Sequence, residues 1–284
     1  MSIKVITDST SYIPEEYIKK YDIKVISLNV IFDGEAEREV DVNQVDFYNR
    51  LAKSDTIPTS SQPTVEEFKS AFIDAVKDGH EVLGIFLSSK LSGTYSTSHL
   101  IKEMVLKEYP EAKIELVDSL NTTMSMGFAV VEAAKAAIEG KKTLKELKED
   151  AENMVKRSDI IFVPGTLTYL RKGGRIGAAS ALIGGILQIT PLLHVNDGEV
   201  ELLEKVRTHK KAVTKMIENI AEKMNERGLG ETVVYHILNR DEGVQLKERL
   251  KNELGLDSPI MDIGPIVGLH VGPGSVGIAY YTKK

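Results

Sequence analysis

The sequence predicts an α/β protein with an N-terminal parallel-sheet, Rossmann-like domain and a C-terminal α+β domain. A ligand is expected to bind between the two domains. Short β-branched runs alternate with segments of helical spacing through the first half. This alternation is typical of a parallel sheet covered by helices on both faces. The second half carries a hairpin signal instead. The chain has 284 residues, which is enough for two domains with separate cores.

Five strands and six helices are predicted in the first half. The strands are short apolar runs at 3–7, 23–32, 81–87, 113–117 and 160–163. The helices have the spacing of amphipathic segments and lie near 14–20, 43–53, 64–78, 93–108, 125–139 and 143–156. Strands that alternate with helices in this way predict a doubly wound parallel-sheet domain over residues 1–164.

The second half, residues 165–284, is predicted to form an α+β layer with a mixed or antiparallel sheet. Asn196-Asp197-Gly198 separates two apolar runs and predicts a tight hairpin, because Asp-Gly suits a turn with positive φ. Helices are expected at about 208–227 and 241–254, between strands in ETVVYHIL, SPIMDI and GSVGIAYYT. No Gly/Ser-rich linker separates the halves, so we expect them to pack firmly and to share a cleft.

The composition excludes several classes of protein. The formal net charge is −6 and the basic residues are scattered, which argues against nucleic-acid binding through phosphate contacts. The chain has no cysteine, so disulfides, a thiolate nucleophile and a Cys-ligated metal are excluded. No other metal site is predicted, since lone aspartates after strands, such as Asp8 and Asp118, are more often caps.

One uncharged run, residues 176–193, approaches the length of a membrane span. Its adjacent glycines, its Ser and Gln, and a proline near its end favour a buried helix followed by a strand. The N-terminus begins with a strand and lacks the apolar core of a signal peptide. We therefore expect no stable membrane insertion and a cytoplasmic protein.

Hydroxyl groups gather where predicted strands pass into helices. In SSKLSGTYSTS (88–98), eight of eleven residues carry a hydroxyl, and PTSSQPT (58–64) precedes another helix. Any one of these residues is most simply a helix N-cap, but the number exceeds what caps require. In open α/β sheets ligands bind beyond the carboxyl ends of the strands. Neutral donors beside helix N-termini there suit a carboxylate or a phosphate.

Sequence motifs for nucleotide binding are absent. No G-x-x-x-x-G-K-[ST] occurs, and no G-x-G-x-x-G follows the first strand. No G-x-S-x-G elbow marks a serine hydrolase, although Ser92 or Ser60 could pair with His270 as a base. A serine-dependent acyl hydrolase therefore stays an open hypothesis.

Two glycine-rich stretches stand out in the second half. LRKGGRIG (170–177) places three cations around two glycines, and GLHVGPG (268–274) is expected to form a rigid loop. Glycines at such places let the backbone approach a ligand closely, although both stretches are also compatible with solvated turns. The run at 176–193 is most simply core, and it could instead line an apolar channel.

The motifs taken together resemble the DegV family of bacterial fatty-acid-binding proteins. They occur in the order DSTSY, PTSSQPT, SSKLSGTYSTS, SMG, LTYLRKGGRIG and GLHVGPGSVG, and the resemblance runs from Ile3 to the C-terminus. It implies a two-domain protein with the EDD fold that holds one long-chain fatty acid between its domains. It also implies that a separate ATP-dependent fatty acid kinase makes the acyl phosphate, which the protein carries toward phospholipid synthesis. The protein would have no catalytic residue of its own.

The resemblance also implies roles for individual residues. The residues expected around the carboxylate are Ser60, Ser61, Ser92, Gly93, Thr94 and His270. The residues expected to meet the kinase or the phosphate are Arg175 and Arg207, and those of the acyl channel are Ile176, Ala179, Ile183 and Leu187. Neither a metal nor a cofactor is implied besides the fatty acid ligand.

Two positions depart from the family pattern. Ser60 stands where threonine is common before Ser-Gln-Pro, which keeps the hydroxyl. Thr190 stands where a lysine commonly precedes Pro-Ile-Leu, which affects any role of a cation in partner docking.

A further alternative is the substrate-binding subunit of dihydroxyacetone kinases, whose fold is similar and which attaches a small triose covalently through a histidine. The uncharged run at 176–193 argues against it, because a triose needs no apolar channel.

Overall fold

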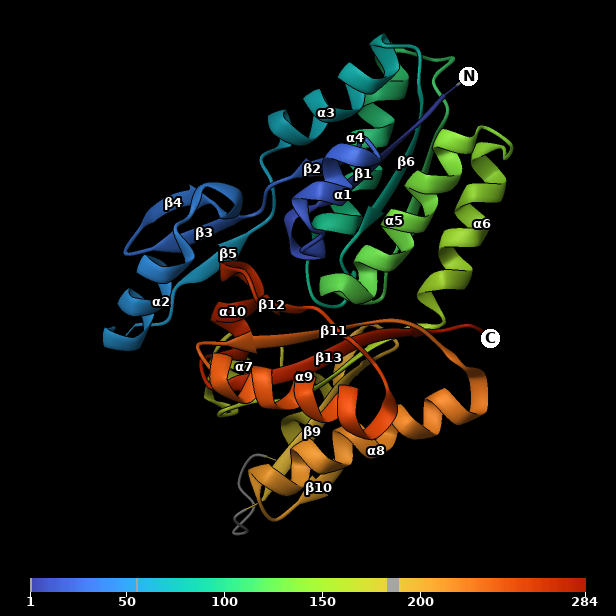
Figure 1. Cartoon of the computed structure of the whole chain (residues 1–284). Coiled ribbons are helices and arrows are strands. Elements are labelled where there is room, and N and C mark those ends of the chain that lie inside the picture. Colours follow the sequence, from blue (N-terminus) through green and yellow to red (C-terminus); the bar gives the residue numbers. More distant parts are fainter. Residues whose placement is uncertain (1, 55, 183–188) are drawn as a thin grey trace.

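The computed structural model describes residues 2–54, 56–182 and 189–284. Figure 1 shows two lobes, one packed on the other, with the N-terminal lobe at the top of the view. The first lobe contains a four-stranded sheet and the second a six-stranded sheet. The predicted α/β class is therefore confirmed.

The four-stranded sheet is parallel throughout, in the order β2-β1-β6-β7. Its strands are β1 (Ile3–Asp8), β2 (Lys24–Ile26), β6 (Glu81–Phe86) and β7 (Ile114–Asp118). Neighbouring side chains on β1 point to opposite faces, so Val5 and Ile6 enter different apolar clusters. Both faces of the sheet are buried, as the near-continuous apolar runs predicted.

Helices cover both faces of this sheet. They are α1 (Glu15–Lys20), α3 (Val65–Lys77), α4 (Thr94–Glu108), α5 (Thr123–Glu139) and α6 (Leu144–Val155). Phe68 and Phe72 of α3 pack with Ile101 of α4 on one face, and α5 and α6 pack on the other. Local caps fix their starts: Thr64 and Thr143 each accept a backbone N–H from the third residue of the helix that follows.

The predicted strand at 23–32 is wrong as a single element. Ser27 and Leu28 interrupt it, and the part beyond them, β3 (Asn29–Phe32), leaves the parallel sheet. It pairs antiparallel with β4 (Glu35–Arg38) and β5 (Thr59–Ser61) in the order β4-β3-β5. With α2 (Gln44–Lys53) these strands form a small subdomain that projects from the first lobe (Figure 1).

The six-stranded sheet has the order β10-β9-β8-β13-β11-β12, with antiparallel neighbours except for β11 and β12. Its strands are β8 (Ser158–Val163), β9 (Thr190–Asn196), β10 (Glu199–Val206), β11 (Leu229–Ile237), β12 (Ile260–Asp262) and β13 (Ser275–Thr282). The predicted hairpin is present, since Asn196 pairs with Glu199 across Asp197-Gly198. The φ angles of those two turn residues are 45° and 86°, as Asp-Gly permits.

β8 corrects the sequence prediction, which placed 160–163 at the end of the first series of strands. It pairs antiparallel with β13 and β9, so it belongs to the second sheet. An apolar run does not say which sheet will bury it, because that depends on partner strands elsewhere in the chain, of which β13 is more than a hundred residues away. The domain division at residue 164 stays a prediction.

The helices of the second lobe are α7 (Thr168–Lys172), α8 (His209–Arg227), α9 (Arg240–Leu254) and α10 (Pro265–Val271). α8 and α9 bury one face of the six-stranded sheet. The other face turns toward the first lobe, where α5 packs against β8 and β13. The two lobes meet where α5 packs against this face of the sheet.

Two further expectations need correction. His270 lies in the last turn of helix α10 rather than in a loop, and only the residues after Val271 form the turn. The uncharged run begins as a 3-10 helix, η3 (Gly177–Leu182), rather than as an α-helix.

Within 2–54, 56–182 and 189–284, no helix has the length and apolarity needed to cross a membrane. Those residues also contain no cluster of His and acidic side chains suited to a metal ion.

Candidate functional site

A cavity of ≈ 860 Å³, its open mouth included, lies between the two lobes. Most of its wall is apolar, with a few polar side chains, which is the usual make-up of a small-molecule site. The inner face of the six-stranded sheet forms one wall, and α10 with the loops at the carboxyl ends of β6 and β7 forms much of the rest. The site therefore lies where the ends of parallel strands meet the second lobe, as expected for open α/β sheets.

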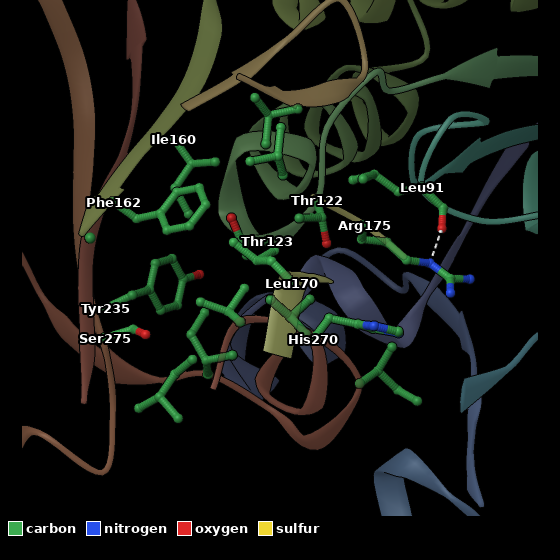
Figure 2. Close-up of a pocket in the computed structure, with 18 of the residues that line it drawn as sticks. Leu91, Thr122, Thr123, Ile160, Phe162, Leu170, Arg175, Tyr235, His270 and Ser275 are labelled. Atoms are coloured by element: carbon green, nitrogen blue, oxygen red, sulfur yellow. Dashed lines mark hydrogen bonds between the residues drawn. The ribbon is translucent and has the colours of Figure 1, made fainter. Parts of the chain in front are cut away.

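The sheet supplies apolar side chains because alternate residues of each strand face inward. Ile160 and Phe162 come from β8, Tyr235 and Ile237 from β11, and they line the cavity. Ile161, between the first two, and Val234, which precedes Tyr235, instead pack under the helices on the opposite face. Figure 2 shows Ile160, Phe162 and Tyr235 gathered on one side of the cavity.

The opposite wall is also apolar. The side chains that form it come from the first lobe, α7 and the α10 region, and they are Leu28, Leu87, Leu91, Leu170, Ile263, Ile266, Val267 and Val271. Burying an alkyl chain between two such walls gains about 0.8 kcal/mol per CH₂. The cavity body is suited to a hydrocarbon.

The mouth is polar and is assembled from four separate segments. Ser60 of β5, Ser92 before α4, Arg175 after α7 and His270 of α10 all line it. Ser60 Oγ lies 2.9 Å from His270 Nε2, and Ser92 Oγ lies 3.0 Å from Thr94 Oγ1. Figure 2 shows Arg175 and His270 on the side of the cavity away from Phe162.

His270 is held as a neutral imidazole. Burial, and secondarily the Arg175 guanidinium, lower the pKa of His270 to about 4. Its Nδ1 edge lies against Gly173, where a Cβ would come within 2.4 Å of that nitrogen. Gly173 therefore leaves the space that lets His270 turn its other nitrogen toward Ser60.

Arg175 joins the two lobes at the mouth. Its Nε donates to the Leu91 carbonyl at 3.1 Å (dashed in Figure 2), and Nη1 donates to the Gly173 carbonyl at 2.6 Å. A second contact lies beside it, where the hairpin tip meets the hydroxyl-rich loop: Ser88 Oγ donates to the Gly198 carbonyl at 2.6 Å. Lys90 adds an ion pair with Asp197 at 2.7 Å.

Most hydroxyls of the stretch 88–98 therefore serve the protein itself. Ser88 binds the hairpin, Ser98 Oγ donates to the Tyr95 carbonyl, and Thr97 Oγ1 donates to Gln62. In this stretch, Leu91 and Ser92 line the cavity. The abundance of hydroxyls marked a loop that borders the cavity, and Ser92 is the hydroxyl residue of this loop that lines it.

The remaining predicted carboxylate residues differ in position. Ser61 follows Ser60 on β5, so its side chain points to the other face of the strand, and it does not line the cavity. Gly93 is the exposed N-cap of α4, and Thr94 is buried against Ser92. The lone Asp8 and Asp118 act as caps: they accept backbone N–H groups of Thr10, Leu87, Ser89 and Leu120.

The predicted partner and channel residues are only partly brought together. Arg207 is exposed beyond the end of β10, and Thr190 pairs with the preceding Val206, so both lie far from the hairpin tip that touches the mouth. Ile176 and Ala179 are buried core residues outside the cavity lining. Ile183 and Leu187 lie outside the described residues.

Sequence reasoning missed a buried carboxyl that supports the mouth from behind. Glu39 Oε1 accepts the N–H of Ile266 at 2.9 Å and the Tyr12 hydroxyl at 2.8 Å, and that hydroxyl in turn accepts the N–H of Val267 at 3.1 Å. Together they cap the start of α10, which carries His270. Burial raises the pKa of Glu39 to about 7. No local motif marks this cap, because Glu39 is distant from α10 in sequence.

Sequence reasoning also missed the residues in the middle of the cavity wall. Thr122 and Thr123 at the start of α5 and Tyr235 of β11 line it. The only available signal was the hydroxyl-rich junction before SMG, where the helix was expected to begin two residues later than it does.

The fold and the cavity define a class: two-lobed α/β proteins that enclose an apolar site with a small polar mouth between the lobes. Comparison with known proteins places the chain within it. A family model described as "Uncharacterised protein, DegV family" matches residues 2–283. A DegV domain-containing protein of Clostridium perfringens is 51% identical over 284 residues, which are 100% of each chain. The chain belongs to the DegV family.

Solved structures agree with this assignment. The structure titled DegV, a fatty acid binding protein from Bacillus subtilis, has a TM-score of 0.88 and 30% identity, with 100% of each chain covered. A stearic-acid-binding protein from Eubacterium ventriosum has a TM-score of 0.89 and 26% identity, with 99% of this chain and 98% of that chain covered. Both proteins are thus described as fatty-acid-binding, and for one of them the fatty acid is stearic acid.

Proposed function

We propose that this protein binds one long-chain fatty acid, with the acyl chain in the interlobe cavity and the carboxylate at the mouth. The observation that carries the proposal is the division of one cavity into two apolar walls and a polar mouth that contains Ser60, Ser92, Arg175 and His270. A buried carboxylate is costly unless several donors meet it. Hydroxyls beside the start of α4, together with one guanidinium, supply such donors.

We also propose that the protein acts in the cytoplasm as a carrier without turnover of its own. It would present the carboxylate to a separate ATP-dependent fatty acid kinase and carry the acyl phosphate toward phospholipid synthesis. The open mouth supports this, because a carboxylate oxygen must reach the γ-phosphate of ATP, with ADP as the leaving group, while the chain stays buried. Arg175 lies at the mouth, and Arg207 with Thr190 at the far end of the hairpin provides a separate surface for the partner.

The first test is mass spectrometry of the purified protein, native and then denatured, with organic extraction of what it carries. We expect a single mass in the fatty acid range that is released on denaturation. A protein that is empty and takes up neither oleate nor palmitate would contradict the binding proposal. Kinase presentation is tested separately, by mixing loaded protein with ATP and a fatty acid kinase and trapping acyl phosphate as a hydroxamate. Absence of hydroxamate with every such kinase would leave a carrier of another kind.

The carboxylate position is tested with a matched pair of serines. Ser92→Ala removes a hydroxyl that lines the mouth, whereas Ser61→Ala removes one on the outer face of β5. We expect Ser92→Ala to release labelled oleate about tenfold faster, the loss typical of one hydrogen bond to a charged group, and Ser61→Ala to match the wild type. Equal release by the two variants would place the carboxylate elsewhere.

One observation favours the second candidate, a serine acyl hydrolase: Ser60 and His270 are within hydrogen-bond distance, as a nucleophile and a base would be. Two features oppose it. In the described part of the chain His270 Nδ1 has no hydrogen-bond partner, so no carboxylate orients the ring. Its lowered pKa also makes it a weak base. Hydrolysis of p-nitrophenyl acyl esters that is abolished by His270→Ala would establish this candidate instead.

A small triose as the ligand has no support in the cavity. The walls are almost wholly apolar, and a polyhydroxylated substrate would leave its hydroxyls unpaired there. A covalent adduct on His270 after incubation with dihydroxyacetone, seen as a mass increase, would revive that alternative.

A further inference from the structure

A helix N-terminus opens into the cavity between the mouth and the far wall, which is the wall formed by the six-stranded sheet. Helix α5 has 17 residues, and its N-cap Thr122 and first residue Thr123 line the cavity. Thr122 makes no side-chain cap for the helix; its hydroxyl donates instead to the Thr10 carbonyl at 3.4 Å. The Tyr235 hydroxyl, reaching across from the second lobe, accepts the N–H of Met124 at 3.2 Å. The start of this helix therefore faces the cavity, and the side chain of its N-cap residue does not accept a backbone N–H of the helix.

Two buried hydroxyls at this place have unused hydrogen-bonding capacity. Thr123 is 0% exposed, and its Oγ1 has no partner in the part of the chain that the structure describes. Tyr235 is 1% exposed, and within the same residues its hydroxyl makes only the contact in which it accepts. Buried polar groups are rarely left without partners. Both O–H groups are therefore available to an acceptor inside the cavity.

The backbone holds Thr123 in an unusual position. Its φ is 58°, which is a left-handed conformation that β-branched residues seldom adopt. Such strain persists only where the surrounding structure enforces it, and it is frequent at binding sites. The tertiary structure thus holds the backbone of Thr123 in place at the cavity wall.

The position and charge of the junction define what it would bind. Figure 2 shows Thr123 between Arg175 and His270 on one side and Phe162 and Tyr235 on the other. Arg175 is the only Lys or Arg among the described residues that line the cavity, and it is at the mouth. A donor-rich, uncharged place part-way along the wall suits the oxygen of a hydroxyl or keto group rather than a carboxylate.

We propose that Thr123, Tyr235 and the start of α5 form a second polar site in the cavity, which binds an oxygen atom carried on the acyl chain. The ligands that it selects are oxygenated long-chain fatty acids, such as monohydroxystearic acids whose hydroxyl lies at the depth of Thr123. This inference rests on the proposed function, because the mouth must hold the carboxylate for the chain to be in register with Thr123.

The test is a displacement titration of delipidated protein with stearate and with a positional series of monohydroxystearic acids. We expect one isomer to bind about tenfold more tightly than stearate, the difference expected for a neutral hydrogen bond made in a buried site. Thr123→Val keeps the β-branched shape and removes the hydroxyl, so the affinity ratio between the preferred isomer and stearate should fall to about one. Tyr235→Phe should reduce the preference as well, and it serves alone if Thr123→Val does not fold.

Two controls separate this site from a general effect on the cavity. Thr122→Val alters a neighbouring hydroxyl that is already used by Thr10, so it should keep the isomer preference. Thr123→Ser should restore it. If the wild type binds every isomer no better than stearate, a water occupies the site or the hydroxyl serves the fold, and the inference is wrong. If neither stearate nor any isomer binds, the proposed function itself fails.

Discussion

The mouth and the far wall of the cavity are built in different ways. The far wall comes largely from one sheet. The alternation of side chains along its strands is enough to place Ile160, Phe162 and Tyr235 on the same face. The mouth joins four segments between Ser60 and His270 that are far apart in sequence, and contacts between the lobes hold them. A substitution in the wall should therefore act mainly on stability and on chain fit. A substitution in the mouth should act mainly on protonation and on retention of the carboxylate.

The largest effect is expected from the wall. Phe162→Ala removes a buried ring, and we expect unfolding to become easier by about 3 to 5 kcal/mol, the usual cost of a buried Phe→Ala change. The enlarged cavity should also shift acyl preference toward longer chains. Urea unfolding and competition between fatty acids of different length measure the two effects. The control is Phe68→Ala, since Phe68 is in the core of the first lobe and outside the cavity lining.

If Phe162→Ala and Phe68→Ala change chain preference equally, the wall does not set chain fit. If Phe162→Ala leaves stability unchanged, Phe162 is not part of a packed wall. Either result would remove the distinction between the two ends of the cavity.

The second effect is a pH dependence that originates behind the mouth. Burial raises the pKa of Glu39 from 4.5 to about 7, so between these values the folded protein holds a proton that the unfolded chain has released. Stability from this group is therefore greatest at low pH and falls as pH rises through that window, by about 3 kcal/mol in all. Glu39→Gln keeps the shape and removes the titration.

Unfolding free energies of the wild type and Glu39→Gln, compared at about pH 4.5 and about pH 7.5, test this linkage. The variant should gain on the wild type as pH rises. Asp8, whose pKa burial raises to about 6, changes stability in the same direction in both proteins, so its contribution cancels apart from its weak electrostatic coupling to Glu39. Parallel pH profiles would show that folding does not raise the pKa of Glu39 and that its cap on α10 carries no such penalty.

The smallest effect is expected on His270 itself. Arg175→Met removes the nearby cation that is the second cause of the lowered pKa of His270, while burial, the first cause, remains. The pKa should therefore rise and still stay below 6.5, as an NMR titration of the His270 ring would show. Lys172→Met is the matched control, because Lys172 is an exposed cation on α7. A pKa that stays the same or falls in Arg175→Met would mean that the guanidinium does not act on the ring.

The sequence by itself determined what local interactions decide. The helix limits follow from residues within one turn, as Thr64 and Thr143 show, and the hairpin follows from Asp197-Gly198. The hydroxyl-rich run after a predicted strand marked the loop that contains Ser92, whereas the candidates Ser60 and His270 came from the motifs that resemble the DegV family. Such signals act over a few residues and need no knowledge of the partner.

Only the tertiary structure decided which surfaces meet. Strand register turns Ser60 inward and Ser61 outward, and the choice of partner strands moves β8 into the second sheet. Glu39 caps a helix more than two hundred residues away, and Thr123 and Tyr235 form a junction only because the lobes close on each other. Pairing, burial and pKa depend on the dense contacts of the folded chain, and no pattern along the sequence contains them.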